Sequence, residues 1–171
     1  LVEEIKDTTL LFALQNWGEP TLVKDLPKII RYTTDAGIFT RLSTNFSINY
    51  TDEYFEEFMK SGLGRLVIDI DGTTQEVYEK YRIGGNLETV FSNLKKLIAE
   101  KNASKSNTKV IWDFIVMKQN EHQVEEAKKM AKGFGIPIKI DCVRTNLKDD
   151  YLNPVDKMID KYSEWLPDNP Q

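Results

Sequence analysis

The sequence predicts an α/β fold, and more specifically a partial, open barrel of the (βα)6 type with about five parallel strands. The first observation is that stretches typical of strands alternate with stretches typical of helices, with strands starting near residues 8, 38, 65, 109 and 137. Most of the intervals are about 27 to 30 residues, which suits one strand, one helix and their loops. Five strands do not complete the eight of a closed barrel. We therefore expect an open sheet, or a sheet from which strands are missing.

The second observation is the pattern of side chains within the strands. In RLVIDID (residues 65–71), the leucine and the isoleucines share one face, whereas Asp69 and Asp71 share the other. The next two strands place Asp113 and Asp141 in the same way. A sheet covered by helices on both faces would show continuous apolar runs, and a dry core would not tolerate these charges unpaired. We expect helices on the apolar face only, and a concave, polar lumen on the other face that holds water or ligand.

The first strand lies within residues 10–20, LLFALQNWGEP, and ends in the turn NWGEP. A glycine lets the backbone approach a ligand closely, and the proline after Glu19 favours an extended conformation at that residue. We therefore expect Glu19 at the carboxyl end of a strand, where parallel α/β proteins bind their ligands. Its carboxylate would suit an amine or a cation. The alternative is an ordinary turn with a solvated glutamate.

The later elements follow from helix and strand signals. Pro27 predicts a kink or a late start in the first helix, Thr51 is a good N-cap, and Asn120 with Gln123 three residues later has the pattern of a capping box. Apolar residues at helical spacing make residues 86–101 the clearest helix, and β-branched and aromatic residues mark the strands. The expected helices are 21–36, 52–61, 73–82, 86–101, 121–134 and 154–165, and the expected later strands are 38–45, 65–71, 109–117 and 136–143.

The composition limits the class of protein. With 171 residues, of which 40% are hydrophobic, the chain can form one domain with a core, made of a partial barrel (8–145) and a C-terminal helical extension (146–171). The net charge of -4 and the lack of a dense basic run argue against nucleic acid as a direct partner. No apolar run approaches the roughly 18 residues of a membrane span. We expect a soluble, cytoplasmic protein with no membrane partner and, because the chain begins with Leu1, a piece of a longer protein.

The sequence offers few residues for metal or nucleophilic chemistry. Cys142 is the only cysteine, which excludes a disulfide within the chain and any multi-cysteine metal or iron-sulfur site supplied by this chain alone. We expect Cys142 to be a buried, small apolar residue. His122, the only histidine, is expected to be exposed at the start of a helix. Asp69 and Asp71 could form a metal pair, but Asp71-Gly72 more often forms a turn, so we expect no metal ligand in this chain.

Five motifs then occur in one order. NWGEP follows the first strand, LSTN and VIDIDG end the next two, YRIGG precedes the long helix, and IVMKQNEH follows the fourth strand. Together they cover about residues 8–145, and the chain resembles the radical S-adenosylmethionine (SAM) superfamily, most closely the branch with an additional C-terminal iron-sulfur (SPASM) domain. The resemblance implies a partial (βα)6 barrel that binds SAM and a [4Fe-4S] cluster. It implies an oxidoreductase that reductively cleaves SAM to a 5′-deoxyadenosyl radical, which modifies a substrate.

The resemblance also implies which residues contact SAM. The backbone of the NWGEP segment and Glu19 would receive the methionine amine, and Arg82 would hold the carboxylate with two parallel hydrogen bonds. Asp69 would contact the ribose or the methionine part, and Met117 would pack against the adenine. Two residues depart from the family pattern, because Trp17 and Phe46 stand where glycine is usual. The implied cofactor-binding residues are Asn16, Trp17, Gly18, Glu19, Pro20, Thr44, Asn45, Asp69, Arg82 and Met117.

The largest departure from the family is the absence of the CxxxCxxC loop that ligates the cluster. We therefore expect no catalytic residue in this chain and no activity of the isolated chain, and we expect a longer parent protein to be the enzyme. The resemblance implies a flavodoxin or a ferredoxin as electron donor, and a peptide or a small molecule as substrate. Two alternatives stay open. One is a degenerate, non-enzymatic binding or scaffold module, and the other is a metal-dependent (βα) barrel enzyme that uses Glu19, Asp69, Asp71 and Asp113.

Overall fold

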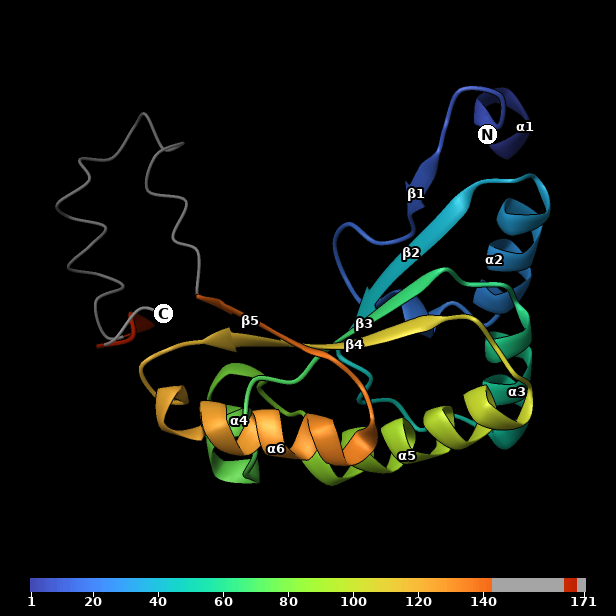
Figure 1. Cartoon of the computed structure of the whole chain (residues 1–171). Helices are drawn as coiled ribbons and strands as arrows, with labels where there is room; N and C mark the ends of the chain where they lie inside the picture. The colour runs from blue at the N-terminus through green and yellow to red at the C-terminus, as the bar shows by residue number, and fades with distance from the viewer. Residues whose placement is uncertain (143–164, 169–171) are drawn as a thin grey trace, which may run out of the picture.

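The computed structural model describes residues 1–142 and 165–168. Five parallel strands form one curved sheet in which the strands follow the order of the chain, β1-β2-β3-β4-β5 (Figure 1). The predicted α/β fold with about five parallel strands is therefore confirmed. The strands are β1 (Leu11–Ala13), β2 (Phe39–Thr44), β3 (Arg65–Asp69), β4 (Lys109–Val116) and β5 (Ile138–Cys142).

Helices α2 to α6 pack against one face of the sheet, at the right and bottom of Figure 1, and no helix of the described residues covers the other face. We call this second face the open face. The helices are α1 (Val2–Ile5), α2 (Leu26–Asp35), α3 (Asp52–Lys60), α4 (Gln75–Tyr81), α5 (Leu87–Ala103) and α6 (Val124–Phe134), with short 3-10 helices η1 (Pro20–Leu22) and η2 (Glu121–Gln123). None of the helices in the described part of the chain has the length and apolar character needed to cross a membrane.

Apolar residues line the helix-covered face in rows that cross the sheet. Leu42, Leu66 and Val110 occupy one register position on β2, β3 and β4, and Ile68 and Trp112 share the next position along. Each of these side chains is fully or almost fully buried. Residues of one strand that are two positions apart point to the same face, so the alternation seen in the sequence places this whole set against the helices.

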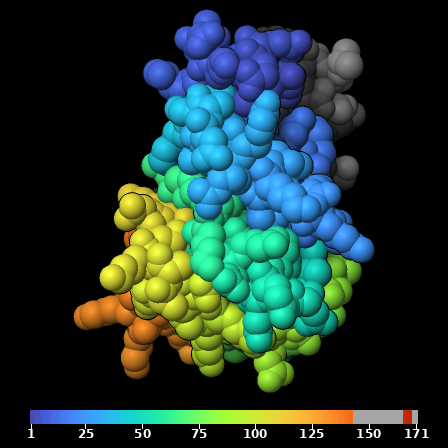
Figure 2. Space-filling view, turned by 90° about the vertical axis from the view of Figure 1, so that its right-hand side faces the viewer, coloured from blue at the N-terminus to red at the C-terminus, as the bar shows by residue number. Residues whose placement is uncertain are grey.

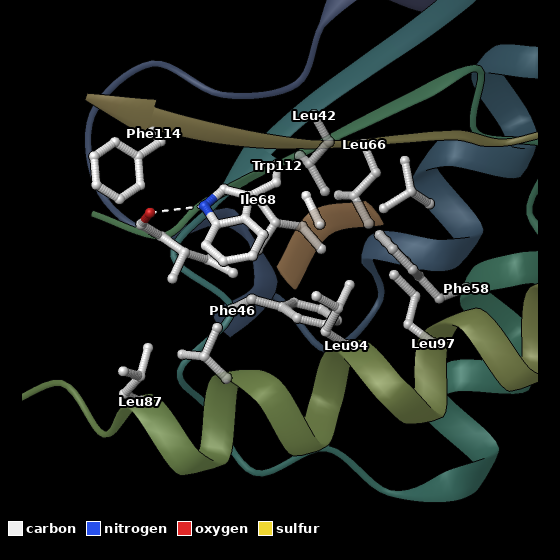
Figure 3. Packing of buried hydrophobic residues seen from close by; sticks show 14 of the residues in the cluster. Leu42, Phe46, Phe58, Leu66, Ile68, Leu87, Leu94, Leu97, Trp112 and Phe114 are labelled. Carbon is white, nitrogen blue, oxygen red and sulfur yellow. Dashed lines mark hydrogen bonds between the residues drawn. The ribbon is translucent and has the colours of Figure 1, made fainter. Parts of the chain in front are cut away.

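Helix α5 closes the core from below, as Figure 3 shows. Its apolar stripe is buried against the sheet, as the helical spacing predicted. The indole Nε1 of Trp112 donates a hydrogen bond to the carbonyl oxygen of Ile70 over 2.7 Å, so the one polar atom of this large side chain is paired. The buried residues of α5 are Leu87, Val90, Asn93, Leu94 and Leu97.

The outer surface in Figure 2 consists of successive segments that follow one another from the blue N-terminal part at the top to the orange part at the bottom. Side chains cap the starts of α3 and α5, and the cap at Thr51 is the one predicted from the sequence. The Thr51 side chain accepts a hydrogen bond from the amide of Tyr54 at the start of α3 (3.2 Å), and the Asn86 side chain accepts one from Thr89 at the start of α5 (2.8 Å). Helix α6 ends at Gly135, which has φ +70°.

Two helix predictions need correction at their N-termini. The helix expected over 21–36 begins only at Leu26, with Pro27 in its first turn and the separate 3-10 helix η1 before it. Of the two options, the late start is the one found, because proline lacks the N–H that a helix interior needs and fits the first turn. The capping box at Asn120 is wrong, since its side chain forms no cap hydrogen bond and bonds within the core.

Other local features agree with the sequence prediction only in part. Helix α1 was not predicted, and the strands are shorter than expected by one to three residues at several ends. His122 is exposed as predicted, whereas Cys142 is only partly buried and was expected to be fully so. The predicted helix over 154–165 lies outside the described residues except for Trp165.

Candidate functional site

The carboxyl ends of the strands form a polar rim, and Glu19 ties two parts of it together. The carboxylate Oε1 accepts hydrogen bonds from the amide (3.0 Å) and the hydroxyl (2.5 Å) of Thr21, and from the hydroxyl of Thr44 (2.6 Å). Its Oε2 accepts one from the amide of Asn45 over 2.9 Å. The loop after β1 is thereby fixed to the end of β2. Oε2 has a single donor and so retains capacity for a further one, such as an ammonium group.

The residues just before Glu19 lie at the surface. Asn16, Trp17 and Gly18 are exposed, and the Trp17 side chain has 94% of its surface accessible. Gly18 has φ +91°, which L side chains rarely adopt, so the turn requires a glycine at this position. Pro20 begins η1 directly after Glu19. The segment predicted to receive an amino group is therefore open to a ligand.

A second turn, at the end of β2, has an unusual backbone. Phe46 adopts φ +56° although it is not a glycine, and its amide donates to the Thr44 hydroxyl over 3.0 Å. The Asn45 side chain accepts a hydrogen bond from the amide of Ser47 (3.1 Å). The left-handed backbone explains why glycine suits this position in a motif of this type. The Phe46 ring is fully buried and lies 5.1 Å from the ring of Tyr50, which compensates for the strained backbone.

Tyr50 and Thr21 belong to the same rim and were not predicted. The two hydroxyl groups are hydrogen-bonded over 2.6 Å, and Thr21 in turn binds Glu19. Burial is the main cause that raises the pKa of Tyr50 to about 12, so its hydroxyl stays neutral. No spacing rule in the sequence connects Tyr50 with Glu19, because the two residues meet only through the fold.

Asp69 lies at the carboxyl end of β3 on the open face, as predicted. The Ser43 hydroxyl on β2 donates to its carboxylate at 2.9 and 3.1 Å. Burial raises the pKa of Asp69 to about 6, while the Arg82 charge and the Ser43 hydrogen bond oppose this rise and nearby Asp71 and Asp113 add to it. Ser43 was missed, although strand alternation places it on the same face as Asp69 and the motif LSTN contains it.

We expect Asp69→Asn to stabilise the chain above pH 6. The folded-state pKa lies above the unfolded value of 3.8, so the stability that protonated Asp69 contributes is present at low pH and is lost as the pH rises through about 6. The variant should therefore exceed the wild type by about 1–3 kcal/mol in free energy of unfolding at pH 8. This difference should vanish near pH 4. Urea unfolding between pH 4 and pH 8 measures it, and a constant difference across that range would contradict the prediction.

Arg82 forms an ion pair that the sequence did not predict. Its Nε and one terminal nitrogen lie 2.8 and 2.6 Å from Oδ2 of Asp71, whose side chain is fully buried, and Asp71 Oδ1 accepts the amide of Ile115 over 2.8 Å. Burial raises the pKa of Asp71, and the Arg82 charge and these hydrogen bonds oppose that rise. Asp71 therefore does not point freely into the lumen with Asp69. It fixes Arg82 at the end of α4.

Asn120 connects the loops at the ends of β3 and β4. Its Oδ1 accepts the amide of Met117 (2.7 Å), and its Nδ2 donates to the carbonyl oxygens of Asp71 (3.1 Å) and Ile115 (2.9 Å). The Met117 side chain is fully buried, and its sulfur accepts a hydrogen bond from the side-chain Nε2 of Gln119 over 3.3 Å. Met117 thus lies beside the rim but under a cover of other residues, and its predicted contact with adenine stays a prediction.

Tyr78 is a buried residue of α4 whose pKa is affected by several of the predicted residues. Burial raises its pKa, the Arg82 charge lowers it, and the carboxylates of Asp71, Asp69 and Glu19 raise it further. Arg82, Asp71, Asp69 and Glu19 thus all contribute to the electrostatic environment of Tyr78. The Tyr78 hydroxyl is buried and has no hydrogen-bond partner among residues 1–142 and 165–168. A signal existed in the sequence, since Tyr78 precedes Arg82 by four residues and shares its helix face.

Further along the open face, two carboxylates meet one lysine. Lys139 Nζ lies 3.6 Å from Asp113 and forms a second ion pair with Asp141. Burial raises the pKa of Asp113, and Lys139 opposes this rise. The prediction that Asp69, Asp113 and Asp141 share the face opposite the helices is confirmed.

The side chains do not suit a metal ion or an iron-sulfur cluster. Within residues 1–142 and 165–168, no group of three or more His, Cys, Asp or Glu side chains could hold a metal. The four carboxylates of the metal-enzyme alternative are engaged separately, with Glu19 bound by hydroxyl and amide donors and Asp71 by Arg82. The single cysteine, Cys142, cannot provide the three thiolates of a [4Fe-4S] site. Acceptors and donors for an amino acid and a ribose are present, so the rim fits SAM but not the cluster.

The chain has a parallel βα sheet with an open polar face and a charged rim. These features place it in the class of partial (βα) barrels, which bind ligands at the carboxyl ends of their strands. The family model described as "Radical SAM superfamily" matches residues 2–132, and the chain belongs to this superfamily. Members use SAM and a [4Fe-4S] cluster. The superfamily resemblance is therefore confirmed.

Curated relatives are enzymes of this superfamily. GTP 3',8-cyclase of Clostridium botulinum is 24% identical over 157 residues, which are 88% of this chain and 47% of that protein. Mycofactocin maturase MftC of Mycolicibacterium smegmatis is 24% identical over 170 residues, 97% of this chain and 42% of the relative. AdoMet-dependent heme synthase of Methanosarcina barkeri is 27% identical over 135 residues, which are 78% of this chain and 37% of that protein. The chain spans about half the length of the curated relatives it matches.

Solved structures support the fold. The structure of TYW1 with a lysine-pyruvate adduct has a TM-score of 0.58 at 18% identity and is matched over 88% of this chain and 50% of its own. Coproporphyrinogen III oxidase (HemN) from Escherichia coli, described as a radical SAM enzyme, has a TM-score of 0.54 at 12% identity, over 91% of this chain and 40% of its own. At these identities the likeness concerns the fold alone.

Proposed function

We propose that this chain is the SAM-binding part of the barrel of a radical SAM enzyme, most closely of the SPASM branch. The observation that carries the proposal is that Glu19, Asp69 and Arg82 are held at the carboxyl ends of neighbouring strands. Glu19 is bonded to Thr44 and Asn45 at the end of β2, Asp69 accepts from Ser43 across β2 and β3, and Arg82 pairs with Asp71 just after β3. An amino acid zwitterion needs an acceptor for its amine and a donor for its carboxylate, and a ribose needs acceptors for its hydroxyl groups. The rim offers all three. In members of the family, the bound cluster supplies the electron for reductive cleavage of SAM.

The residues of this chain would bind and orient SAM. The open backbone of residues 16–18 and Oε2 of Glu19 would receive the amine. Arg82 directs two of its nitrogens to Asp71, and its other terminal nitrogen is free among the described residues to donate to the carboxylate. Asp69, ionised above pH 6, would accept the ribose hydroxyl groups. Asp71 has a supporting role, because it fixes the direction of the Arg82 side chain.

We propose that the isolated chain is inactive and that a longer parent protein is the enzyme. One cysteine cannot ligate the cluster, so no residue of this chain is proposed as catalytic. The parent would take its electron from a flavodoxin or a ferredoxin, and its substrate would be a peptide or a small molecule. Anaerobic reconstitution of a cysteine-bearing parent with iron and sulfide should give iron-sulfur absorbance and 5′-deoxyadenosine. A parent that yields neither would not be a radical SAM enzyme.

We expect Asp69→Ala to weaken SAM binding by the chain about tenfold, since a charge-assisted hydrogen bond contributes about 1.5–3 kcal/mol. Isothermal titration calorimetry at pH 8 measures the affinity. Asp35→Ala, which removes an exposed carboxylate on α2, is the matched control and should bind as the wild type does. If wild-type chain shows no SAM binding at millimolar concentration, or if Asp69→Ala binds equally well, the proposed site is wrong.

A further inference from the structure

Three cationic side chains form a row across the open face. Arg41 of β2 is in register with Arg65 of β3, and Arg65 is in register with Lys109 of β4. Neighbouring strands lie about 4.8 Å apart, so residues in register on one face are adjacent. Like charges at adjacent positions repel one another and destabilise the folded chain. We therefore expect a bound anion to neutralise the positive charges of this row.

The described residues do not provide this anion. Neither Arg41 nor Arg65 forms an ion pair or a side-chain hydrogen bond within the described part of the chain, and the Nε atom of each is buried without a hydrogen-bond partner. Both side chains are half-buried, so each guanidinium is partly removed from water without compensation. Their terminal nitrogens remain available as donors, in the fork geometry that binds carboxylate or phosphate oxygens in pairs.

The carboxylates of the open face have other partners. Asp69 accepts hydrogen bonds from Ser43, and Asp113 and Asp141 pair with Lys139. Arg41 has only the smallest effect among the causes that act on the pKa of Asp113. The acidic groups lie toward the rim, whereas the arginines lie toward the amino ends of the strands. The two ends of the lumen thus differ in charge.

The neighbours of Arg41 and Arg65 leave space for a ligand and make the environment of the two guanidinium groups less polar. Ala13 of β1 is in register with Arg41, is exposed and has a small side chain, so the space beside the guanidinium is open. Val67 is the next residue of β3 on the open face and is only 7% exposed. An anion bound between apolar neighbours interacts more strongly with a guanidinium than it would in bulk water.

We propose that Arg41 and Arg65 bind an anionic group of the substrate, a carboxylate or a phosphate, at the base of the lumen. The inference rests on the proposed function, because it takes the lumen to be the substrate site. Arg65 precedes Asp69 by four residues of β3, which corresponds to about 13 Å along the strand. The substrate is therefore an elongated molecule whose anionic end lies at the arginines and whose reacting end lies near the rim.

Binding of two probe anions tests the proposal. Inorganic pyrophosphate and malonate are titrated calorimetrically at low ionic strength into the wild-type chain, Arg41→Gln and Arg65→Gln. We expect at least one probe to bind, and each substitution to weaken it about tenfold or more. The control Arg31→Gln, an exposed arginine on α2, should bind as the wild type does. Tighter pyrophosphate binding indicates a phosphate, and tighter malonate binding a carboxylate. No binding of either probe, or equal binding by all variants, overturns the proposal.

Stability provides a second, independent readout. Removing an unpaired, half-buried charge should raise the urea midpoint of Arg41→Gln and Arg65→Gln in the absence of anion, whereas a residue with a structural role would lower it. Arg65→Lys keeps the positive charge but loses the planar pair of donors that can bind two oxygens at once. It should therefore weaken anion binding less than Arg65→Gln does. Titration of SAM into the same samples separates the two proposals. Anion binding without SAM binding would leave the arginine site standing and refute the proposed function, and the reverse result would refute only the arginine site.

Discussion

Phe46→Ala is expected to lower the free energy of unfolding by about 3–5 kcal/mol, because it leaves a cavity in the core. The Phe46 ring is fully buried in the core, between Tyr50 at 5.1 Å and Phe55 at 6.1 Å. Its carbonyl oxygen accepts a hydrogen bond from Asn93 of α5 over 2.9 Å, so the turn cannot easily collapse into the vacated space. Urea unfolding followed by tryptophan fluorescence measures the loss.

Phe46→Gly separates the contribution of the ring from that of the backbone. A residue with a Cβ atom at φ +56° costs about 1–2 kcal/mol, which glycine does not incur. Glycine ordinarily loses about 0.5–1 kcal/mol relative to alanine through backbone entropy. The backbone gain offsets that loss, and we expect Phe46→Gly to be at least as stable as Phe46→Ala. If the glycine variant were clearly less stable, or if both variants matched the wild type, the packing and strain inferred for this turn would be wrong.

The fold could be predicted because its signals are local and repeated. The alternation in β3 and β4 separates the buried Ile68 and Trp112 from Asp69 and Asp113, and burial of one face follows directly from that pattern. The start of α2 at Leu26 illustrates the limit of such signals. Pro27 predicts that the helix is interrupted or delayed, but not which of the two occurs.

The rim was predicted only in part, because its interactions join residues far apart in the chain. Glu19 and Asp69 were expected at strand ends, and the structure places them there. The partners of Glu19 at Thr44 and Asn45 are 25 and 26 residues away, and no periodicity specifies such a contact. The capping box predicted at Asn120 does not form, because the Asn120 side chain instead hydrogen-bonds to three backbone groups of the rim loops. Tertiary contacts thus override the local sequence pattern.

Strand alternation predicts the wrong direction for the Asp71 side chain. Counting by twos along RLVIDID puts it beside Asp69 on the open face. β3 ends at Asp69, however, and Asp71 is buried at the ends of β3 and β4, where Ile115 and Arg82 satisfy its oxygens. A residue beyond the end of a strand takes its direction from its hydrogen-bond partners. The pair it forms with Arg82 should therefore dominate the stability of the rim.

We expect Arg82→Ala to lower the free energy of unfolding by about 3 kcal/mol at pH 8, because it leaves the buried Asp71 carboxylate without its cation. The loss should depend on pH. Removal of the Arg82 charge raises the pKa of Asp71 further above the unfolded value of 3.8, so the variant loses stability as the pH rises through that range. The deficit relative to the wild type should accordingly be smaller at pH 5 than at pH 8, as measured by urea unfolding at the two pH values.

A double-mutant cycle distinguishes this charge effect from simple loss of packing. Asp71→Asn removes the charge and keeps an acceptor for the amide of Ile115, so Arg82→Ala combined with Asp71→Asn should recover most of the stability and lose the pH dependence. Lys60→Ala, which breaks an exposed pair with Glu56 on α3, is the control and should cost less than about 1 kcal/mol at either pH. Additive losses in the cycle, or a deficit equal at both pH values, would show that Arg82 stabilises the rim through contacts other than its pairing with Asp71.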